Sequence, residues 1–300
     1  MNKGASAFSA FTTAIFLTVA AHAEGGREGW YGGLDLGLAI SRDMDMRGRS
    51  DDVPTNCDQH LGRATVNGVS LPLPLSDPRC ARGSEGWKSS FDIDNGPLLG
   101  LNVGYAWRGF RFEAEYFYRQ HDGEYSGSEI TSGDKQPEFI QSGERISDIR
   151  GHQFFGNVYY DFRDTRSKLI PYIGGGMGLM LARMDYSAGY LRNSDQNVIG
   201  RLGRNPNAAG TLSSQNEVLS DVLWGYQLLA GADYTLTERV FLGVKARYVD
   251  FLNDLEDSGL PNILRSHAPT VAPGGDDVRN EFRTDDFGFW GVSLNIKYFF

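Results

Sequence analysis

The 300-residue sequence lacks long apolar runs, and this limits how it can cross a membrane. After residue 23 no stretch reaches the roughly 18 apolar residues that a spanning helix needs. Basic residues are also in a minority, and the formal net charge of −9 argues against nucleic acid as a partner. The remaining membrane-spanning option is a closed β-barrel, because lipid requires every backbone group to be paired internally.

Cysteine is equally scarce, with only Cys57 and Cys80, both in a polar and proline-rich stretch. Two cysteines without paired histidines offer no zinc-site spacing, and we expect no metal and no cofactor. In an exported protein the oxidising compartment favours a Cys57–Cys80 disulfide. A chain-entropy estimate gives that bond a value of about 3 kcal/mol. Two free thiols are the alternative.

The N-terminal residues have the pattern of a secretory signal peptide. Lys3 gives a positive start, Phe8 to Ala21 is an apolar and small-residue run, and Ala21-His22-Ala23 is a small-x-small cleavage site. The run is too short and too rich in Ser and Thr for a comfortable transmembrane helix. We therefore expect residues 1–23 to be a signal peptide and residues 24–300 to be the mature domain. An uncleaved anchor is the alternative.

Glycine is abundant but accompanied by many aromatic residues, which favours β structure over disorder. Segments of about ten residues alternate apolar with small or polar side chains, the period of a transmembrane β-strand. The predicted strands are residues 30–41, 98–107, 110–119, 151–162, 169–184, 222–235, 240–251 and 287–300. The sequence thus predicts an all-β, eight-stranded antiparallel up-and-down barrel, in which the last strand closes against the first near Leu34 to Ile40.

The two faces of these strands indicate which side meets lipid. One face is apolar and unbroken by charge, whereas the other carries the charged residues together with glycines. A narrow barrel interior needs small residues for room, so the charged face is expected inside and the apolar face outside. Aromatic residues at strand ends are expected to form a girdle near the periplasmic rim. They are Trp30, Tyr31, Trp107, Phe110, Phe162, Tyr172, Tyr234, Phe241, Tyr298 and Phe300.

Connection lengths alternate, and this orients the predicted barrel. Short turns alternate with long polar loops at about 42–96, 120–150, 185–221 and 252–286. Short periplasmic turns and long extracellular loops are typical of outer-membrane barrels, so both termini are predicted to be periplasmic. The first loop holds both cysteines, and its Val66-Asn67-Gly68-Val69 segment is a two-residue hairpin signal.

Three segments carry a family resemblance: GWYGGLDLG at 29–37, GYAWRGFRFEAEY at 104–116 and KYFF at 297–300. They resemble the OmpA-like eight-stranded outer-membrane barrels, and the nearest branch is the opacity-protein and Msp4-like surface-antigen group. The resemblance implies a bacterial outer-membrane location, with lipid and the barrel-assembly machinery as partners. The terminal alternation resembles the signal that this machinery reads; its residues are Leu294, Ile296, Tyr298 and Phe300.

The charges on the inward face form the main candidate site. The acidic members are Asp35, Glu113, Glu115, Asp161 and Asp233, and the basic members are Arg111, Lys245, Arg247 and Lys297. An isolated buried charge is costly, so these groups are expected to pair inside the barrel. A structural plug is the favoured interpretation, because eight strands leave just enough room for their own side chains. A narrow gated pore is the alternative.

Catalytic and calcium sites have weaker support. The histidines after residue 23 are His60, His121, His152 and His267, and no serine lies in a Gly-x-Ser-x-Gly context. Asp285 and Asp286 with His267 are conceivable at the outer rim, but the acids are explained more simply as solvated loop residues. The segment 92–96 begins like a calcium loop but lacks its later ligands. We expect a non-enzymatic surface barrel whose loops bind a surface or host ligand. A small-solute porin is the alternative, and a barrel enzyme is less favoured.

Overall fold

The structure is a computed structural model that describes residues 28–50, 53–80, 85–123, 125–126, 138–163, 167–259, 263–266 and 279–300. The predicted signal peptide, residues 1–23, lies outside these ranges. None of the helices in the described ranges has the length and apolar character needed to cross a bilayer.

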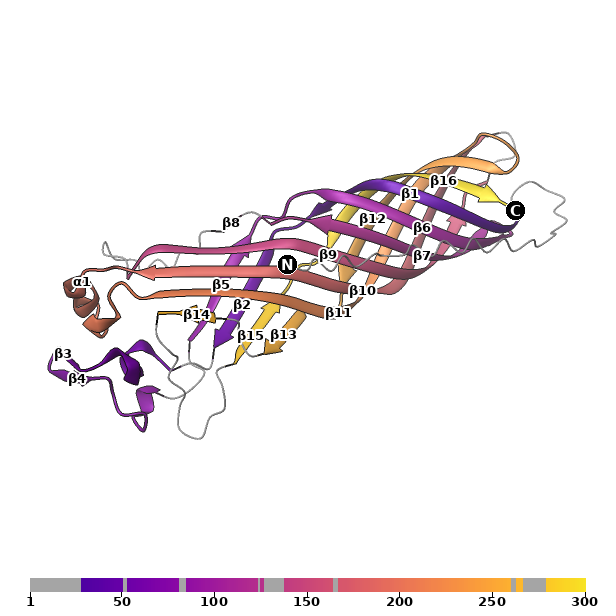
Figure 1. Cartoon of the computed structure of the whole chain (residues 1–300). Helices are drawn as coiled ribbons and strands as arrows, with labels where there is room; N and C mark the ends of the chain where they lie inside the picture. Colours follow the sequence, from indigo (N-terminus) through magenta and orange to yellow (C-terminus); the bar gives the residue numbers. More distant parts are fainter. Residues whose placement is uncertain are drawn as a thin grey trace, which may run out of the picture.

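Eight antiparallel strands form the wall of a closed barrel (Figure 1). They are β1 (Gly29–Ser41), β6 (Gly96–Trp107), β7 (Phe110–His121), β9 (Phe139–Asp161), β10 (Leu169–Arg192), β11 (Leu212–Thr235), β12 (Val240–Phe251) and β16 (Phe289–Phe299). Each pairs with the next along the chain, and β16 returns to pair with β1. In this closing seam Leu34 faces Ile296 and Ile40 faces Trp290. The predicted fold class is confirmed.

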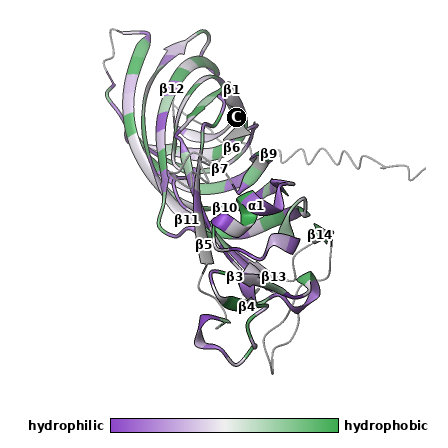
Figure 2. Cartoon of the chain, turned by 90° about the vertical axis from the view of Figure 1, so that its left-hand side faces the viewer, coloured by the Kyte–Doolittle hydropathy of each residue, from purple (hydrophilic) through white to green (hydrophobic). Residues whose placement is uncertain are grey.

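The alternation of the sequence sets the two faces of the wall. On β1 and β16, Leu34 and Leu294 are 56% and 61% exposed, whereas Asp35 and Lys297 are each 1% exposed. Hydrophobic and hydrophilic residues alternate in the same way along other barrel strands, such as β12 (Figure 2). This apolar-out, polar-in pattern is that of a transmembrane barrel.

Three strands extend far beyond the lengths that the sequence predicted. β9 begins at Phe139 instead of 151, β10 continues to Arg192 instead of 184, and β11 begins at Leu212 instead of 222. The predicted loops at 120–150 and 185–221 are therefore partly strand. The short α1 (Gln196–Arg201) and the 3-10 turn η4 (Pro206–Ala208) connect β10 to β11. They lie at the opposite end of the molecule from the C-terminus (Figure 1).

A second, four-stranded sheet faces these extensions. Its order is β13 (Leu255–Gly259), β15 (Asn280–Thr284), β2 (Met44–Ser50) and β5 (Glu85–Phe91). Two shorter strands, β8 (Tyr125–Ser126) and β14 (Ile263–Arg265), pair with β9 and β11. We call the second sheet, the extensions of β9 to β11 with β8 and β14, and residues 53–80 and 193–211 the head.

The head has an apolar interior, the reverse of the barrel. Its buried residues include Met44, Met46, Phe91, Ile146, Met180, Met184, Tyr186, Leu219, Leu223, Leu255 and Phe282. The reversal is visible within β10, where the outward face changes from Leu181 to Arg183 and Asp185. The inward face of β10 changes from glycines to Met180, Met184 and Tyr186. The strands thus leave the apolar environment near Leu181.

Residues 53–80, the disulfide segment, form a compact unit at the end of the head. The predicted Cys57–Cys80 disulfide and the predicted hairpin are both present, with Val66 opposite Val69. The hairpin strands are β3 (Ala64–Val66) and β4 (Val69–Leu71), and the 3-10 turns are η1 (Thr55–Cys57), η2 (Gln59–Leu61) and η3 (Pro78–Cys80). Leu61 packs against Ile199 and Ala208, so the segment is attached to the β10–β11 connection.

Candidate functional site

The charged residues inside the barrel form two layers. In the layer nearer the C-terminal end, Arg111 contacts Asp161 at 2.9 Å and Asp233 at 3.3 Å. Lys297 donates to Asp233 at 2.7 Å. Arg163 lies 3.6 Å from Asp161 and adds a cation that the sequence analysis did not include. These buried carboxylates are therefore matched by nearby cations, as burial of charge requires.

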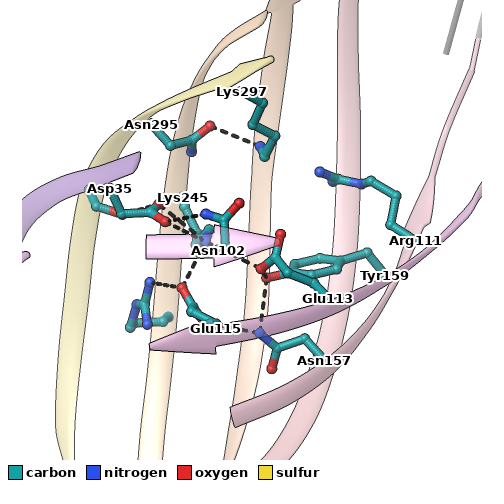
Figure 3. A network of polar contacts seen from close by, with 12 residues as sticks. Asp35, Asn102, Arg111, Glu113, Glu115, Asn157, Tyr159, Lys245, Asn295 and Lys297 are labelled. Atoms are coloured by element: carbon teal, nitrogen blue, oxygen red, sulfur yellow. Dashed lines mark hydrogen bonds and ion pairs between the residues drawn. The ribbon is translucent and has the colours of Figure 1, made fainter. Parts of the chain in front are cut away.

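The second layer is centred on Lys245, which lies between Asp35 and Glu115 (Figure 3). Its Nζ is 3.1 Å from Asp35 Oδ1, 2.9 Å from Glu115 Oε1 and 3.8 Å from Glu113 Oε1. Arg247 contacts the same Glu115 oxygen at 2.8 Å. The structure thus brings all nine predicted charges into the two layers, which we call the lumen network.

Amide and tyrosine side chains complete the lumen network, and the sequence analysis did not assign them to it. Asn102 donates to Asp35 at 2.7 Å, while Asn157 and Gln227 donate to Glu115 at 2.9 and 3.0 Å. Tyr31 and Tyr159 donate to Glu113 at 2.9 and 2.8 Å. The three amides occupy inward-facing positions of the alternation, and this position was the only feature of the sequence that indicated their place in the lumen. The sequence could not indicate which carboxylate each would reach.

Three of the aromatic residues predicted for the rim girdle point into the barrel instead. Tyr31, Tyr172 and Phe241 are 0–2% exposed, whereas Trp107 and Tyr298 of the same prediction face outward. The physical reason is the strand period: all three occupy the positions of their strands that face inward. A position near a strand end therefore does not by itself place an aromatic ring in the lipid interface.

Inward side chains of β9 explain the glycine row of the predicted fifth strand, because Gly174, Gly176 and Gly178 lie opposite Tyr159, Asn157 and Phe155. Tyr159 lies opposite Gly174, where an added Cβ would come within 2.5 Å of the ring. Tyr31 lies opposite Gly104 in the same way, again at 2.5 Å. Each ring occupies the space that the side chain of its cross-strand neighbour would fill. The glycines are thus needed for close packing of rings across the lumen.

An aromatic layer lies between the lumen network and the head core. Phe117 stacks on Phe155 with ring centroids 5.7 Å apart and meets Phe289 edge-on at 6.2 Å. The Arg247 guanidinium lies 4.3 Å from the Phe117 ring centroid, and that of Arg119 lies 4.2 Å from Phe289. The interior therefore passes from charged layers to aromatic rings and then to the apolar head core.

Arg119 holds the segment before β16 against this layer. It is 3% exposed and donates to the Phe287 carbonyl at 2.8 Å. No carboxylate of the described ranges forms an ion pair with it. Its guanidinium is instead compensated by the carbonyl and by the Phe289 ring.

Among the histidines that the structure describes, His121 lies beside a serine without forming a hydrolytic triad. Ser41 Oγ lies 3.3 Å from His121 Nδ1, but the same nitrogen is 2.9 Å from the backbone carbonyl of Asp94. His267 lies outside the described residues, so the proposed grouping with Asp285 and Asp286 is untested. Within the described ranges, no three His, Cys, Asp or Glu residues form a group that could hold a metal ion.

Comparisons with known proteins place the barrel in a family. The sequence pattern of the family "Outer membrane protein beta-barrel domain" matches residues 9–263. The chain belongs to this family. The resemblance to eight-stranded outer-membrane barrels is confirmed, and the barrel is a bacterial outer-membrane barrel. The opacity-protein and Msp4-like branch stays a prediction. No curated protein matches the chain significantly.

Several solved outer-membrane proteins are similar to this chain. Neisserial surface protein A (NspA) is 15% identical, with coverage of 91% of this chain and 97% of that chain and a TM-score of 0.37. OprG from Pseudomonas aeruginosa is also 15% identical, with coverage of 92% and 98% and a TM-score of 0.41. Ail of Yersinia pestis is 9% identical, with coverage of 90% and 99% and a TM-score of 0.18.

Proposed function

We propose that the protein is a closed outer-membrane barrel that holds its head at the cell surface, where the head binds a ligand. The observation that carries the proposal is the packed lumen network, whose charges contact one another across the barrel. Lys245 on β12 reaches Asp35 on β1 and Glu115 on β7. Side chains from three parts of the wall thus meet inside it, as expected for a plug.

The head supports the display role. It is built from long extensions of barrel strands and from a disulfide-linked segment, both of which favour a rigid surface structure. Its apolar core and the cluster of Phe117 and Phe289 are joined by Phe251, which packs against both, so apolar side chains continue from the head into the barrel interior. Rigid scaffolds that present loops are a common basis for recognition.

Planar-bilayer conductance distinguishes the plug from a porin. We expect the purified protein to insert without stable single-channel openings at neutral pH. Regular openings that change in size or disappear when Lys245 and Arg247 are replaced by Met would contradict the plug and favour the narrow porin. The surface variant Arg283→Gln is the matched control, because Arg283 lies in the head sheet and pairs with Asp254.

The orientation requires a separate experiment on intact cells. We expect a membrane-impermeant maleimide to label Ser70→Cys in β4, whereas Glu238→Cys in the β11–β12 turn should react only after lysis. Ser70 and Glu238 are both exposed in the structure, so their reactivity depends on the side of the membrane. Labelling of Glu238→Cys alone on intact cells would reverse the orientation and contradict surface display.

A further inference from the structure

A cavity of about 410 Å³ lies at the far end of the head, between the disulfide segment and the connection after α1. Its lining comes from residues between Pro54 and Arg79 of the disulfide segment and from Gly203 and Arg204 of the connection. We call it the tip pocket. We propose that it binds a small amphipathic anion, namely an organic carboxylate or sulfonate with a compact apolar body. This inference rests on the proposed function for the claim that the pocket faces the outside of the cell.

The apolar part of the ligand is specified by the hairpin. Val66, Val69 and Leu71 of the hairpin line the pocket together with Leu73 and Cys57, and they supply its branched apolar side chains. The volume lies within the range of roughly 300–1,000 Å³ that is typical of small-molecule sites. A compact ring or short branched chain therefore fits, whereas a folded protein would contact only the mouth.

The charged part is specified by two arginines. Arg79 and Arg204 line the pocket from two different segments: Arg79 belongs to the disulfide segment and Arg204 to the β10–β11 connection. Among the described residues that line it there is no carboxylate, although the chain as a whole has a net charge of −9. A planar guanidinium binds carboxylate and sulfonate oxygens in a bidentate manner, so the local charge selects an anion.

Contacts outside the pocket hold both arginines in place. Asp77 accepts from Arg79 Nε at 2.9 Å and from Nη2 at 2.8 Å, and these bonds lower the pKa of Asp77 to about 2. Glu138 lies 3.4 Å from Arg204 Nε. Both acids compensate part of the positive charge, but neither lines the pocket. The guanidinium groups are thus oriented before a ligand arrives, which reduces the entropy lost on binding.

The two walls are also fixed relative to each other. Asn56 Nδ2 donates to the Gly203 carbonyl at 2.9 Å, and its Oδ1 accepts from the Asn205 backbone at 3.1 Å. Asn205 Nδ2 in turn donates to the Gly62 carbonyl at 3.0 Å. These bonds connect segments about 150 residues apart in the chain, and the Cys57–Cys80 bond links the two ends of the disulfide segment. The cavity is therefore a built feature of the head.

The test uses 4-(trifluoromethyl)benzenesulfonate as the probe and its uncharged sulfonamide as the matched comparison. Binding is followed by fluorine NMR titration of the full mature protein in nanodiscs, with empty nanodiscs as the blank. We expect saturable binding of the sulfonate, weakened by salt because both arginines are partly exposed, and at least tenfold weaker binding of the sulfonamide. Equal affinity for the two probes, or no binding of the sulfonate, would overturn the proposal.

Variants locate the site. Arg79→Gln and Arg204→Gln should each weaken sulfonate binding several-fold, and Val69→Trp should abolish it by filling the cavity. Arg283→Gln removes a head arginine outside the pocket and should bind normally. Folding of each variant is checked by its heat-modifiable gel mobility and by the intact disulfide. Loss of binding in the Arg283 variant, or normal binding in all three pocket variants, would place the anion elsewhere. Because the titration uses purified protein, its outcome is independent of the labelling experiment that tests orientation.

Discussion

Glu115 is the carboxylate on which the second lumen layer depends. It accepts from Lys245, Arg247, Asn157 and Gln227 at 2.8–3.0 Å and is 3% exposed. We predict that Glu115→Gln lowers the free energy of unfolding by about 3–5 kcal/mol, because it leaves two buried cations without their shared counter-charge. Urea-induced unfolding in lipid vesicles measures this change.

Two further variants test the cause of that loss. Glu281→Gln removes an exposed acid of β15 and should change stability by less than about 0.5 kcal/mol. A quadruple variant with Met at positions 35, 115, 245 and 247 removes two buried acids together with their two cations. It should recover much of the stability, since an apolar replacement of a whole buried ion group is often neutral. If Glu115→Gln is as stable as the wild type, the layer is not a compensated charge group.

The contact between Gly174 and Tyr159 gives a second prediction for a single residue. A Cβ at Gly174 would lie 2.5 Å from the Tyr159 ring and 2.8 Å from the Val158 carbonyl. We therefore expect Gly174→Val to destabilise the barrel by several kcal/mol, or to prevent folding, as overpacking does. Gly189→Val on the same strand is the control, because nothing lies within 4 Å of its added Cβ. The gel mobility of unheated samples compares the two variants.

Alternation identified the nine lumen charges because each occupies an inward position of its strand. The hydrogen-bonding amides and the inward tyrosines were not identified as partners, since alternation gives a face but not the register between strands. Asn157 reaches Glu115 only because β7 and β9 pair with Glu113 opposite Asn157. The register depends on closure of the whole sheet, which no local pattern encodes.

Strand ends were the least accurate part of the sequence prediction. On β10 the alternation continues from Leu181 to Ala188, but the polarity of its two faces reverses where the strand leaves the membrane. On β9 a register shift near Asp148, which has φ of 53°, changes the inward positions along the chain from even to odd residue numbers. A β-bulge of this kind interrupts the period of two, so the predicted strand began only at 151.

The disulfide segment is expected to be a separable element. We predict that the double variant Cys57→Ser/Cys80→Ser increases proteolysis within residues 53–80 while the barrel stays heat-modifiable. The loss of the loop constraint corresponds to about 3 kcal/mol of local stability. Limited proteolysis followed by mass spectrometry measures the cleavage sites. Unchanged resistance of this segment would show that contacts such as Leu61 with Ile199 suffice to hold it.

The final strand carries a prediction about assembly. Leu294, Ile296, Tyr298 and Phe300 face outward, and Phe300 is 55% exposed. We expect deletion of Phe300 to reduce the yield of barrel in the outer membrane, because the exposed aromatic end is the proposed recognition signal. Membrane fractionation and gel mobility measure the yield. Deletion with normal insertion would contradict the signal, and Phe300→Tyr, which retains the ring, should assemble normally.

At the scale of the whole molecule, cleavage of the signal peptide is a prediction, because residues 1–23 lie outside the described ranges. We predict that the protein isolated from the outer membrane lacks residues 1–23, as measured by intact mass. A mass that includes these residues would favour the uncleaved anchor. The outer-membrane family and the closed barrel agree with export, but the cleavage position comes from the Ala21-His22-Ala23 pattern alone.

The seam between β1 and β16 has a kinetic consequence. Beyond Ser41 and Phe289 the same two chain segments pair again, as β2 with β15, from Met46 opposite Thr284 to Ser50 opposite Asn280. Separation of the first and last barrel strands therefore also requires rupture of a second ladder outside the membrane. Opening of the wall at this seam should be slow, and unfolding should show strong hysteresis between denaturation and refolding. Once both ladders have formed, the barrel is closed by two consecutive sets of strand hydrogen bonds, and only the β1–β16 set lies in the part of the wall that faces lipid.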